Sequence, residues 1–207
     1  WEFLNGPDTD PEAIRELASA CADGRPCFVT LINYHKDGHP FWMRVEKEPV
    51  FDAQGKLAYF ISIERDVSES KAQEAALARS EQMLREAIEA LADGFVLFDQ
   101  DDRVVLFNER YREMYRSSAD LIHVGRKFED GLRIGVERGQ YPEALEDPEG
   151  WIKARMEVHL NPSEEPVEQL LDDCRWVQIR EHPTESGGIV GIRTDVSELK
   201  KAQLDAE

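Results

Sequence analysis

The stretch GFVLFDQDDRVVLFNERYREMY, residues 94–115, fixes the architecture of the larger part of the chain. Residues 94–99 and 104–108 are apolar runs of strand length, and the QDDR segment between them suits a tight hairpin turn. Residues 109–116 then predict a short helix. The stretch therefore opens a folded module with a β-hairpin that leads into a helix.

The rest of this module follows from glycine, proline and capping signals. Residues 117–144 predict short helices broken by four glycines, and residues 147–160 predict a helix with Asp147 as its cap and Pro148 at its first position. Three further strands complete the pattern, at 166–173, 174–182 and 187–194.

The order strand, strand, helices, strand, strand, strand resembles a PAS domain, which is a five-stranded antiparallel sheet with helices packed across one face. The resemblance rests on residues 94–115 at the entry and on GGIVGIRTDVSELKKAQ (187–203) at the exit, and it covers 85–203. It implies an α+β fold of PAS type. It does not identify a ligand, because one fold serves many functions.

The exit of this module has a copy earlier in the chain. ERDVSESKAQ (64–73) matches RTDVSELKKAQ (193–203), and each segment runs from a strand-like stretch into a charged helical one. This repeat predicts two modules of one type. Asp66 and Asp195 are predicted as helix N-caps and as the points of signal relay, with Glu69 and Glu198 at capping-box spacing.

The first module reads as the back half of a related domain. Residues 10–24 predict a helix, and three strands follow at 27–36, 41–52 and 57–66. FLNGPDTD (3–10), NYHKDGHPFW (33–42) and YFISIERDVSE (59–69) resemble a LOV domain, the flavin-binding, blue-light-sensing branch of the PAS family. A half sheet would expose an edge, so we expect the front half to exist in the parent protein.

The resemblance also implies flavin-site positions, and most of them are altered. Trp1 stands where the family has its reactive cysteine, and an indole has no thiol to add to the flavin. Asn33 keeps one of two flavin-binding asparagines, Met43 replaces the other, and Glu64 replaces the glutamine of the last strand. We therefore predict no bound cofactor, with FMN held without a covalent bond as the alternative.

The segment between the modules predicts a long helix. Leu77, Leu84, Ile88 and Leu91 are spaced 7, 4 and 3 residues apart, as in the seam of a coiled coil. This seam predicts a parallel homodimer. The alternative is an amphipathic helix that packs on its own module.

Composition excludes several classes of function. The net charge of -18 disfavours binding to nucleic acid or to an anionic membrane surface. No apolar run is long enough to span a bilayer, and the three cysteines form no CxxC pair, which predicts a cytoplasmic location. We predict no metal site and expect three histidines to lie at the surface or at helix ends: His123, His159 and His182. We expect five aromatic residues to form core, the alternative being a pocket lining: Tyr111, Tyr115, Phe128, Trp151 and Trp176.

Taken together, the sequence predicts the sensory and dimerisation region of a signalling protein such as a histidine kinase or a cyclic-di-nucleotide enzyme, with the output domain elsewhere in the parent chain. The chain itself carries no catalytic motif. The alternatives are a flavin-binding photoreceptor and a dimerisation module without ligand. The predicted organisation has four parts: a partial LOV-like domain (1–66), a linker helix (67–92), a PAS domain (93–195) and an outgoing helix (196–207).

Overall fold

The computed structural model describes residues 2–205. They form two compact units, the first of which ends at Gln82 and the second of which begins at Met83. The units are described one at a time. Within residues 2–205, none of the helices combines the length and the apolar character that a membrane crossing requires.

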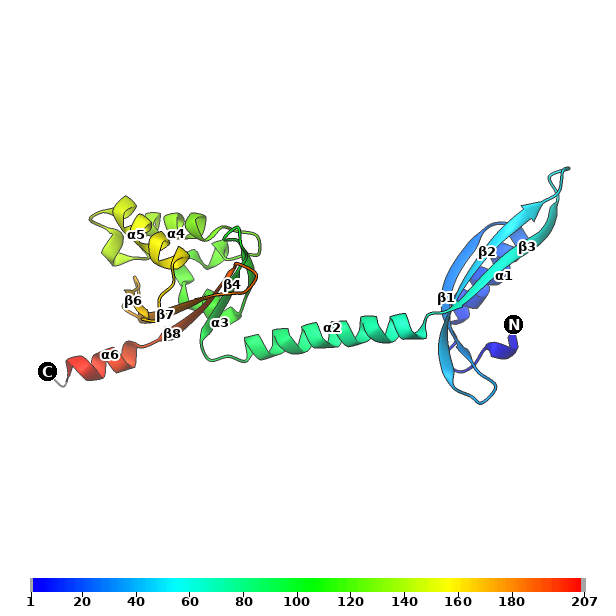
Figure 1. Cartoon of the computed structure of the whole chain (residues 1–207), viewed down its shortest axis with the longest axis horizontal. Coiled ribbons are helices and arrows are strands. Elements are labelled where there is room, and N and C mark those ends of the chain that lie inside the picture. Colours follow the sequence, from blue (N-terminus) through cyan, green and yellow to red (C-terminus); the bar gives the residue numbers. More distant parts are fainter. Residues whose placement is uncertain (1, 206–207) are drawn as a thin grey trace. The chain divides into compact units, whose positions relative to one another are not determined.

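The first unit is a three-stranded antiparallel sheet with one helix packed on it (Figure 1). Its elements are η1 (Glu2–Leu4), α1 (Pro11–Asp23), β1 (Cys27–Tyr34), β2 (Pro40–Phe51) and β3 (Leu57–Asp66), with the strands in the order β1-β2-β3. The predicted ends of α1 are confirmed. The carboxylate of Asp10 accepts a hydrogen bond from the Glu12 amide, and Gly24 ends the helix with a φ of 64°, which glycine adopts without strain.

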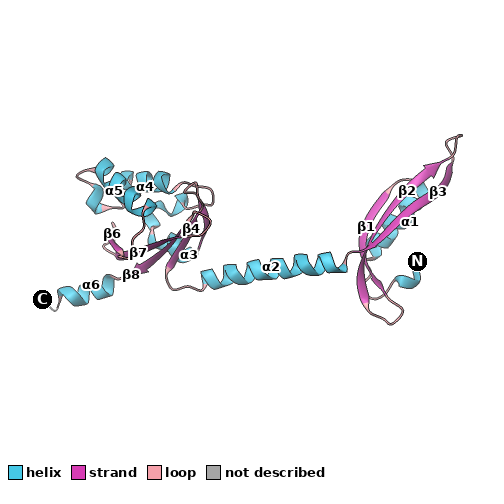
Figure 2. Cartoon of the chain, viewed as in Figure 1, coloured by secondary structure: helices cyan, strands magenta, loops and turns pink. Residues whose placement is uncertain are grey.

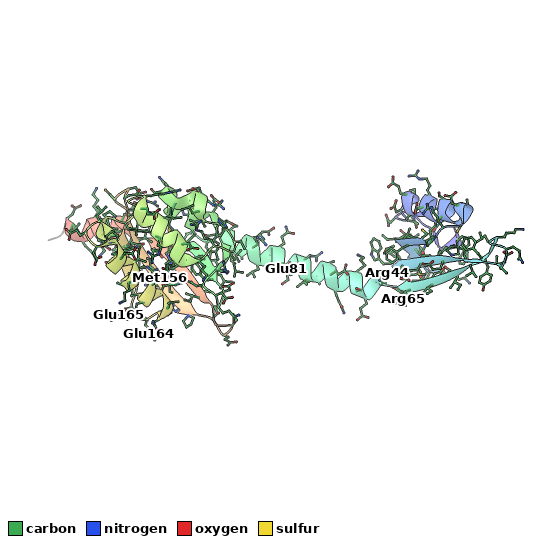
Figure 3. The ribbon with its side chains drawn as sticks, turned by 90° about the horizontal axis from the view of Figure 1, so that it is seen from above. Arg44, Arg65, Glu81, Met156, Glu164 and Glu165 are labelled. Carbon is green, nitrogen blue, oxygen red and sulfur yellow. The ribbon has the colours of Figure 1, made fainter. Side chains whose placement is uncertain are left out.

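The two faces of this sheet differ in burial. Leu17 of α1 and Leu31 of β1 pack together, and each is only 1% exposed. On the opposite face, Arg44 and Arg65 are direct register partners (Figure 3), and the Arg44 guanidinium lies 5.5 Å from the centre of the Phe28 ring. This outer face also exposes large apolar side chains: Phe28, Trp42, Tyr59, Ile61 and Ile63.

The second unit is a complete five-stranded antiparallel sheet, as predicted. Its strands, in the order β5-β4-β8-β7-β6, are β4 (Gly94–Phe98), β5 (Val104–Phe107), β6 (Val167–Leu170), β7 (Trp176–Pro183) and β8 (Ile189–Asp195). The helical segments are α3 (Glu109–Met114), η2 (Arg116–Leu121), α4 (Phe128–Glu137), η3 (Pro142–Ala144) and α5 (Pro148–Leu160).

Helices and sheet enclose one apolar core in this unit. Figure 2 shows α4 and α5 together over the sheet, and the two helices are in contact. Val96 and Phe98 of β4, Val177 and Ile179 of β7, and Leu132 of α4 are all buried there. The period of two along the strands and the helical period of α4 both place apolar side chains in this layer.

Two helices leave the sheets. α2 (Ser68–Glu89) follows β3 and buries none of its residues, and α6 (Ser197–Leu204) follows β8. α2 ends earlier than the predicted seam requires, since Leu91 lies two residues beyond Glu89. The glycine at 94 is already the first residue of β4, so the chain must leave helical geometry before it.

Candidate functional site

A small hollow in the first unit gathers three of the four predicted flavin-site residues. Asn33, Met43 and Glu64 come from β1, β2 and β3 and line it together with Leu17 and Leu31. Alternation along three paired strands turns these side chains to the face that α1 covers. Trp1, the fourth predicted residue, lies outside the described residues.

The hollow does not reproduce the flavin site that the LOV resemblance implies. Asn33 is 3% exposed, and its amide nitrogen is already bonded to the Leu4 carbonyl at 3.2 Å and to Asn5 Oδ1 at 3.3 Å. Met43 offers no amide at the second position. Glu64 is exposed and presents a carboxylate where a donor would be needed. The described residues therefore do not fit that cofactor.

The passage from β3 into α2 is held by three hydrogen bonds, which we call the first clasp. The Val67 amide donates to the Trp42 carbonyl at 2.8 Å, and the Trp42 amide donates back to Ser68 Oγ at 2.8 Å. The Ser68 amide donates to Asp66 Oδ1 at 2.9 Å. The start of α2 is thus tied to the neighbouring strand β2.

The second unit repeats this arrangement between β8 and α6, and we call it the second clasp. The Val196 amide donates to the Trp176 carbonyl at 2.8 Å, the Trp176 amide donates to Ser197 Oγ at 2.9 Å, and the Ser197 amide donates to Asp195 Oδ1 at 3.0 Å. The sequence repeat therefore encodes a repeated set of bonds that includes a tryptophan on the adjacent strand.

The clasps correct the predicted capping. Asp66 and Asp195 are the last residues of β3 and β8 rather than N-caps, and each helix begins two residues later because the intervening valine still pairs with the next strand. Each aspartate carboxylate accepts a hydrogen bond from the backbone amide two residues later in the chain, and this bond closes a short turn. The capping box is absent at the first clasp, where the Glu69 carboxylate accepts from Gln73 Nε2. The Ser68 hydroxyl and amide hold the pKa of Asp66 below its ordinary value.

A buried asparagine receives the end of α2 in the second unit. Asn108 is fully buried, and its Nδ2 donates to the carbonyls of Ile88 at 3.1 Å and Asp93 at 2.9 Å. Its Oδ1 accepts from the amides of Phe95 at 2.8 Å and Tyr111 at 3.0 Å. One side chain thus joins the end of α2 to β4 and to α3.

A network of charged side chains lies inside the second unit. Glu181 Oε1 is 2.6 Å from Arg193 Nη2, 3.0 Å from Arg155 Nη2 and 3.0 Å from His159 Nδ1. His159 Nε2 is 2.8 Å from Asp102 Oδ1, which lies in the β4–β5 turn. We call these five residues the buried ionic network, and sequence reasoning missed it.

The position of His159 corrects the expectation of a surface or helix-end histidine. It is fully buried between Phe98 and Phe128, and both ring nitrogens face carboxylates. Burial disfavours its charged form, but Asp102 and Glu181 outweigh that cost and raise the pKa of His159 above its ordinary value. Burial would likewise raise the pKa of Glu181, yet its cationic neighbours hold that pKa well below the ordinary range.

The other predicted site residues are dispersed. Tyr111, Tyr115 and Phe128 line a cavity in the second unit. Trp151 instead stacks on Tyr141, and Trp176 belongs to the second clasp. His123 and His182 are exposed. In residues 2–205, no group of three or more histidine, cysteine or acidic side chains is placed to hold a metal ion.

The predicted seam residues on α2 are Leu77, Leu84 and Ile88. Leu77 and Leu84 are 62% and 60% exposed, while Ile88 is half-buried near the second sheet. The seam of α2 is available to a partner, and the homodimer stays a prediction.

Comparison with known proteins assigns the family. The family profile described as PAS fold matches residues 88–204, and the one described as PAS domain matches residues 1–69. The chain belongs to the PAS family. It is a tandem PAS sensory region of signal-transduction type, and the clasps lie where each PAS unit passes into its outgoing helix.

Curated relatives match across both PAS units. A blue-light-activated histidine kinase of Brucella canis is 30% identical over 220 residues, which is 98% of this chain and 42% of that protein. The protein of the same name from Brucella anthropi is 28% identical over 98% of this chain and 43% of its own length. The chain therefore spans about two-fifths of the length of these relatives.

Solved structures align over part of the chain. One, described as "Flavin Analogue Sheds Light on Light-Oxygen-Voltage Domain Mechanism", is 33% identical, with a TM-score of 0.33, over 40% of this chain and 60% of that chain. The PAS domain of the fruit-fly ELK potassium channel is 26% identical, with a TM-score of 0.31, over 32% of this chain and 54% of that chain.

Proposed function

We propose that the chain is the input region of a histidine-kinase-type signalling protein and that the two clasps relay changes in the PAS sheets to the helices behind them. The observation that carries this proposal is the duplicated clasp. The same three bonds join a sheet to a helix in both units. The curated relatives, which match nearly the whole chain, are named as histidine kinases.

The relay follows from what each clasp connects. A shift of β2 moves the Trp42 backbone, and the bond to Ser68 transmits that shift to the first turn of α2. Asn108 then holds the far end of α2 to the second sheet through the Ile88 carbonyl. A parallel homodimer through Leu77 and Leu84 would convert a change in helix orientation into one of two seam arrangements.

The test is autophosphorylation of the full-length parent protein. Ser197→Ala removes the acceptor of the Trp176 amide and should change the basal rate several-fold, because the start of α6 is no longer fixed. Ser163→Ala is the matched control, since its hydroxyl donates to the Glu165 carbonyl in its own loop, away from either clasp. A parent protein without a phosphorylated histidine would exclude the kinase proposal, and equal rates in both variants would exclude the relay.

A blue-light receptor is the second candidate, because the relatives that cover 98% of the chain carry that activity in their name. The fit of the hollow argues against a flavin bound in the LOV manner, as Asn33 is the one described residue that keeps an amide there. The absorption spectrum of the full-length parent protein distinguishes the two. A flavin band that bleaches under blue light would establish the receptor, and a colourless protein would exclude it.

A further inference from the structure

The imidazole of His159 lies between two carboxylates inside the second PAS unit. Its side chain is fully buried, with Nε2 2.8 Å from Asp102 Oδ1 and Nδ1 3.0 Å from Glu181 Oε1. A protonated imidazole offers an N–H to each carboxylate, whereas a neutral imidazole carries only one N–H. Loss of the proton therefore leaves one carboxylate opposite the lone pair of a ring nitrogen, and the two repel each other.

The two carboxylate contacts of His159 are unequal. Nε2 forms a hydrogen bond with Asp102, while Nδ1 lies at ion-pair distance from Glu181 and forms no hydrogen bond with any of residues 2–205. Glu181 also has Arg155 and Arg193 as counter-charges, whereas the described chain places no cation besides His159 at ion-pair distance from Asp102. The proton is therefore lost from Nδ1 and kept on Nε2. The electron pair of the broken N–H bond stays on Nδ1, and the proton passes to water.

The backbone around this site is shaped to hold the charged side chains. A Cβ added at Gly191 would lie 2.6 Å from Arg193 Nη1, so glycine leaves room for the guanidinium that reaches Glu181. A Cβ added at Gly94, the register partner of Arg193, would lie 3.2 Å from the Arg193 Cβ. Asp102 has a φ of 60°, a left-handed conformation that is uncommon for residues other than glycine. The charged site is thus built into the sheet and its turn.

Both protonation states of His159 have a stabilising feature. The charged groups around the imidazole come from four elements: Asp102 of the β4–β5 turn, Arg155 of α5, Glu181 of β7 and Arg193 of β8. β4 and α4 add the rings of Phe98 and Phe128, and Arg193 Nε donates to the Tyr115 hydroxyl. The neutral imidazole leaves two cations and two anions in balance, while the protonated form satisfies both carboxylates. Burial lowers the pKa of His159, but Asp102 and Glu181 outweigh burial and raise that pKa above its ordinary value.

We infer that the second PAS unit senses pH through His159, and that proton loss from Nδ1 displaces Glu181 together with Arg193 of β8. The protonated state holds at low pH, and the displacement follows as the pH rises. Arg193 lies two residues before Asp195, whose carboxylate accepts from the Ser197 amide in the second clasp. That the displacement reaches an output domain rests on the proposed function. The proton site and the movement of β8 do not.

Histidine-selective NMR of the full chain, recorded from mildly acidic to alkaline pH, tests this assignment. We expect one of the five imidazoles to titrate at a higher pH than the others, and the backbone amide signals of Val196 and Ser197 to shift with the same midpoint. His159→Gln should remove this transition from the imidazole and the amide signals alike. His123→Gln is the matched control, because His123 is exposed, and it should leave both transitions in place.

Asp102→Asn supplies a second variant that changes the charge and not the imidazole. Asparagine also adopts the left-handed conformation of this turn. The variant should weaken proton binding at least about tenfold, the smaller effect expected of one nearby opposite charge, and should lower both midpoints together. Circular dichroism checks the fold, and Asp102→Asn carries the test if His159→Gln does not fold.

Three results would overturn the assignment: no imidazole that titrates above the others, a titration of His159 that leaves the Val196 and Ser197 amides unshifted, or midpoints that stay unchanged in Asp102→Asn. A parent protein without kinase activity would exclude the proposed function and leave these NMR results standing.

Discussion

Replacing Glu181 by glutamine is the most direct test of the buried ionic network. The change keeps the shape of the side chain and removes its charge. Glu181 is 6% exposed and, among residues 2–205, is the one carboxylate within 3.2 Å of both buried guanidiniums, Arg155 and Arg193. Asp102 remains in the network, but its contact is with His159. The variant therefore leaves two buried cations without their counter-charge.

The expected loss is large for one substitution. Removing one partner of a buried ion pair costs about 3–5 kcal/mol. The amide oxygen of glutamine still accepts a bond from Arg155 or Arg193, which places the expected loss near the lower end, at about 3 kcal/mol. With a urea dependence of about 2 kcal/mol per molar, the unfolding midpoint of the second unit should fall by roughly 1.5 M.

Urea unfolding followed by tryptophan fluorescence measures this loss, because Trp151 and Trp176 both report on the second unit. Glu185→Gln is the matched control, since Glu185 is exposed in the β7–β8 turn, and its midpoint should stay near that of the unmodified chain. The charge also predicts the pH dependence. The pKa of Glu181 is held low in the folded state, so its stabilisation is present above the ordinary glutamate pKa and is lost as the pH falls below it. Glu181→Gln should flatten this acid slope.

A loss below about 1 kcal/mol, the range of exposed ion pairs, would refute the reasoning. It would mean that the guanidiniums find other acceptors or water once the charge is gone, and that the network is not a principal support of this fold.

Three further predictions concern the remaining features. The protonated His159 side chain stabilises the fold fully below the ordinary histidine pKa, and this stabilisation is lost as the pH rises through the raised folded-state pKa. His159→Gln removes it, so the unfolding midpoints at mildly acidic and at alkaline pH should differ less for the variant than for the unmodified chain. An unchanged difference would contradict the two carboxylate contacts. Asn108→Ala should cost about 2–4 kcal/mol, because it removes the side-chain partner of the Phe95 amide and of the Ile88 and Asp93 carbonyls, and thermal unfolding of the second unit measures this. Leu84→Glu should dissociate the homodimer in analytical ultracentrifugation, and an intact dimer would exclude the seam. Arg79→Gln, an exposed change on the same helix that lies off the seam spacing, serves as its control.

Local signals in the sequence predicted much of the fold. The Asp10 and Gly24 signals located both ends of α1, and apolar runs between turn signals located the strands of both sheets, because these effects act between residues that are close along the chain. The repeated Asp-Val-Ser segment located both passages from sheet to helix. It did not reveal the tryptophan on the adjacent strand, since Trp42 and Ser68 are 26 residues apart and no local pattern links them.

The buried ionic network was missed for the same physical reason. His159 and Asp102 lie 57 residues apart, and Arg155 and Glu181 lie 26 apart. Charged residues on a helix and a strand ordinarily predict solvent-facing positions. The packing of α5 on the sheet places these charges inside the unit, and the amino-acid composition does not indicate this packing.

The clasps also set the rotational phase of the outgoing helices. An α-helix turns about 100° per residue, so each residue of α2 leaves the first sheet at an angle fixed by its count from Ser68. Two residues inserted into α2 would turn Leu84 by about 200°, to nearly the opposite side, whereas seven would turn it by only about 20°. A chimaeric protein joined behind Ser197 should therefore tolerate insertions or deletions of seven residues in its linker helix. The number of residues in the helix thus determines the direction in which the seam faces, and with it the output.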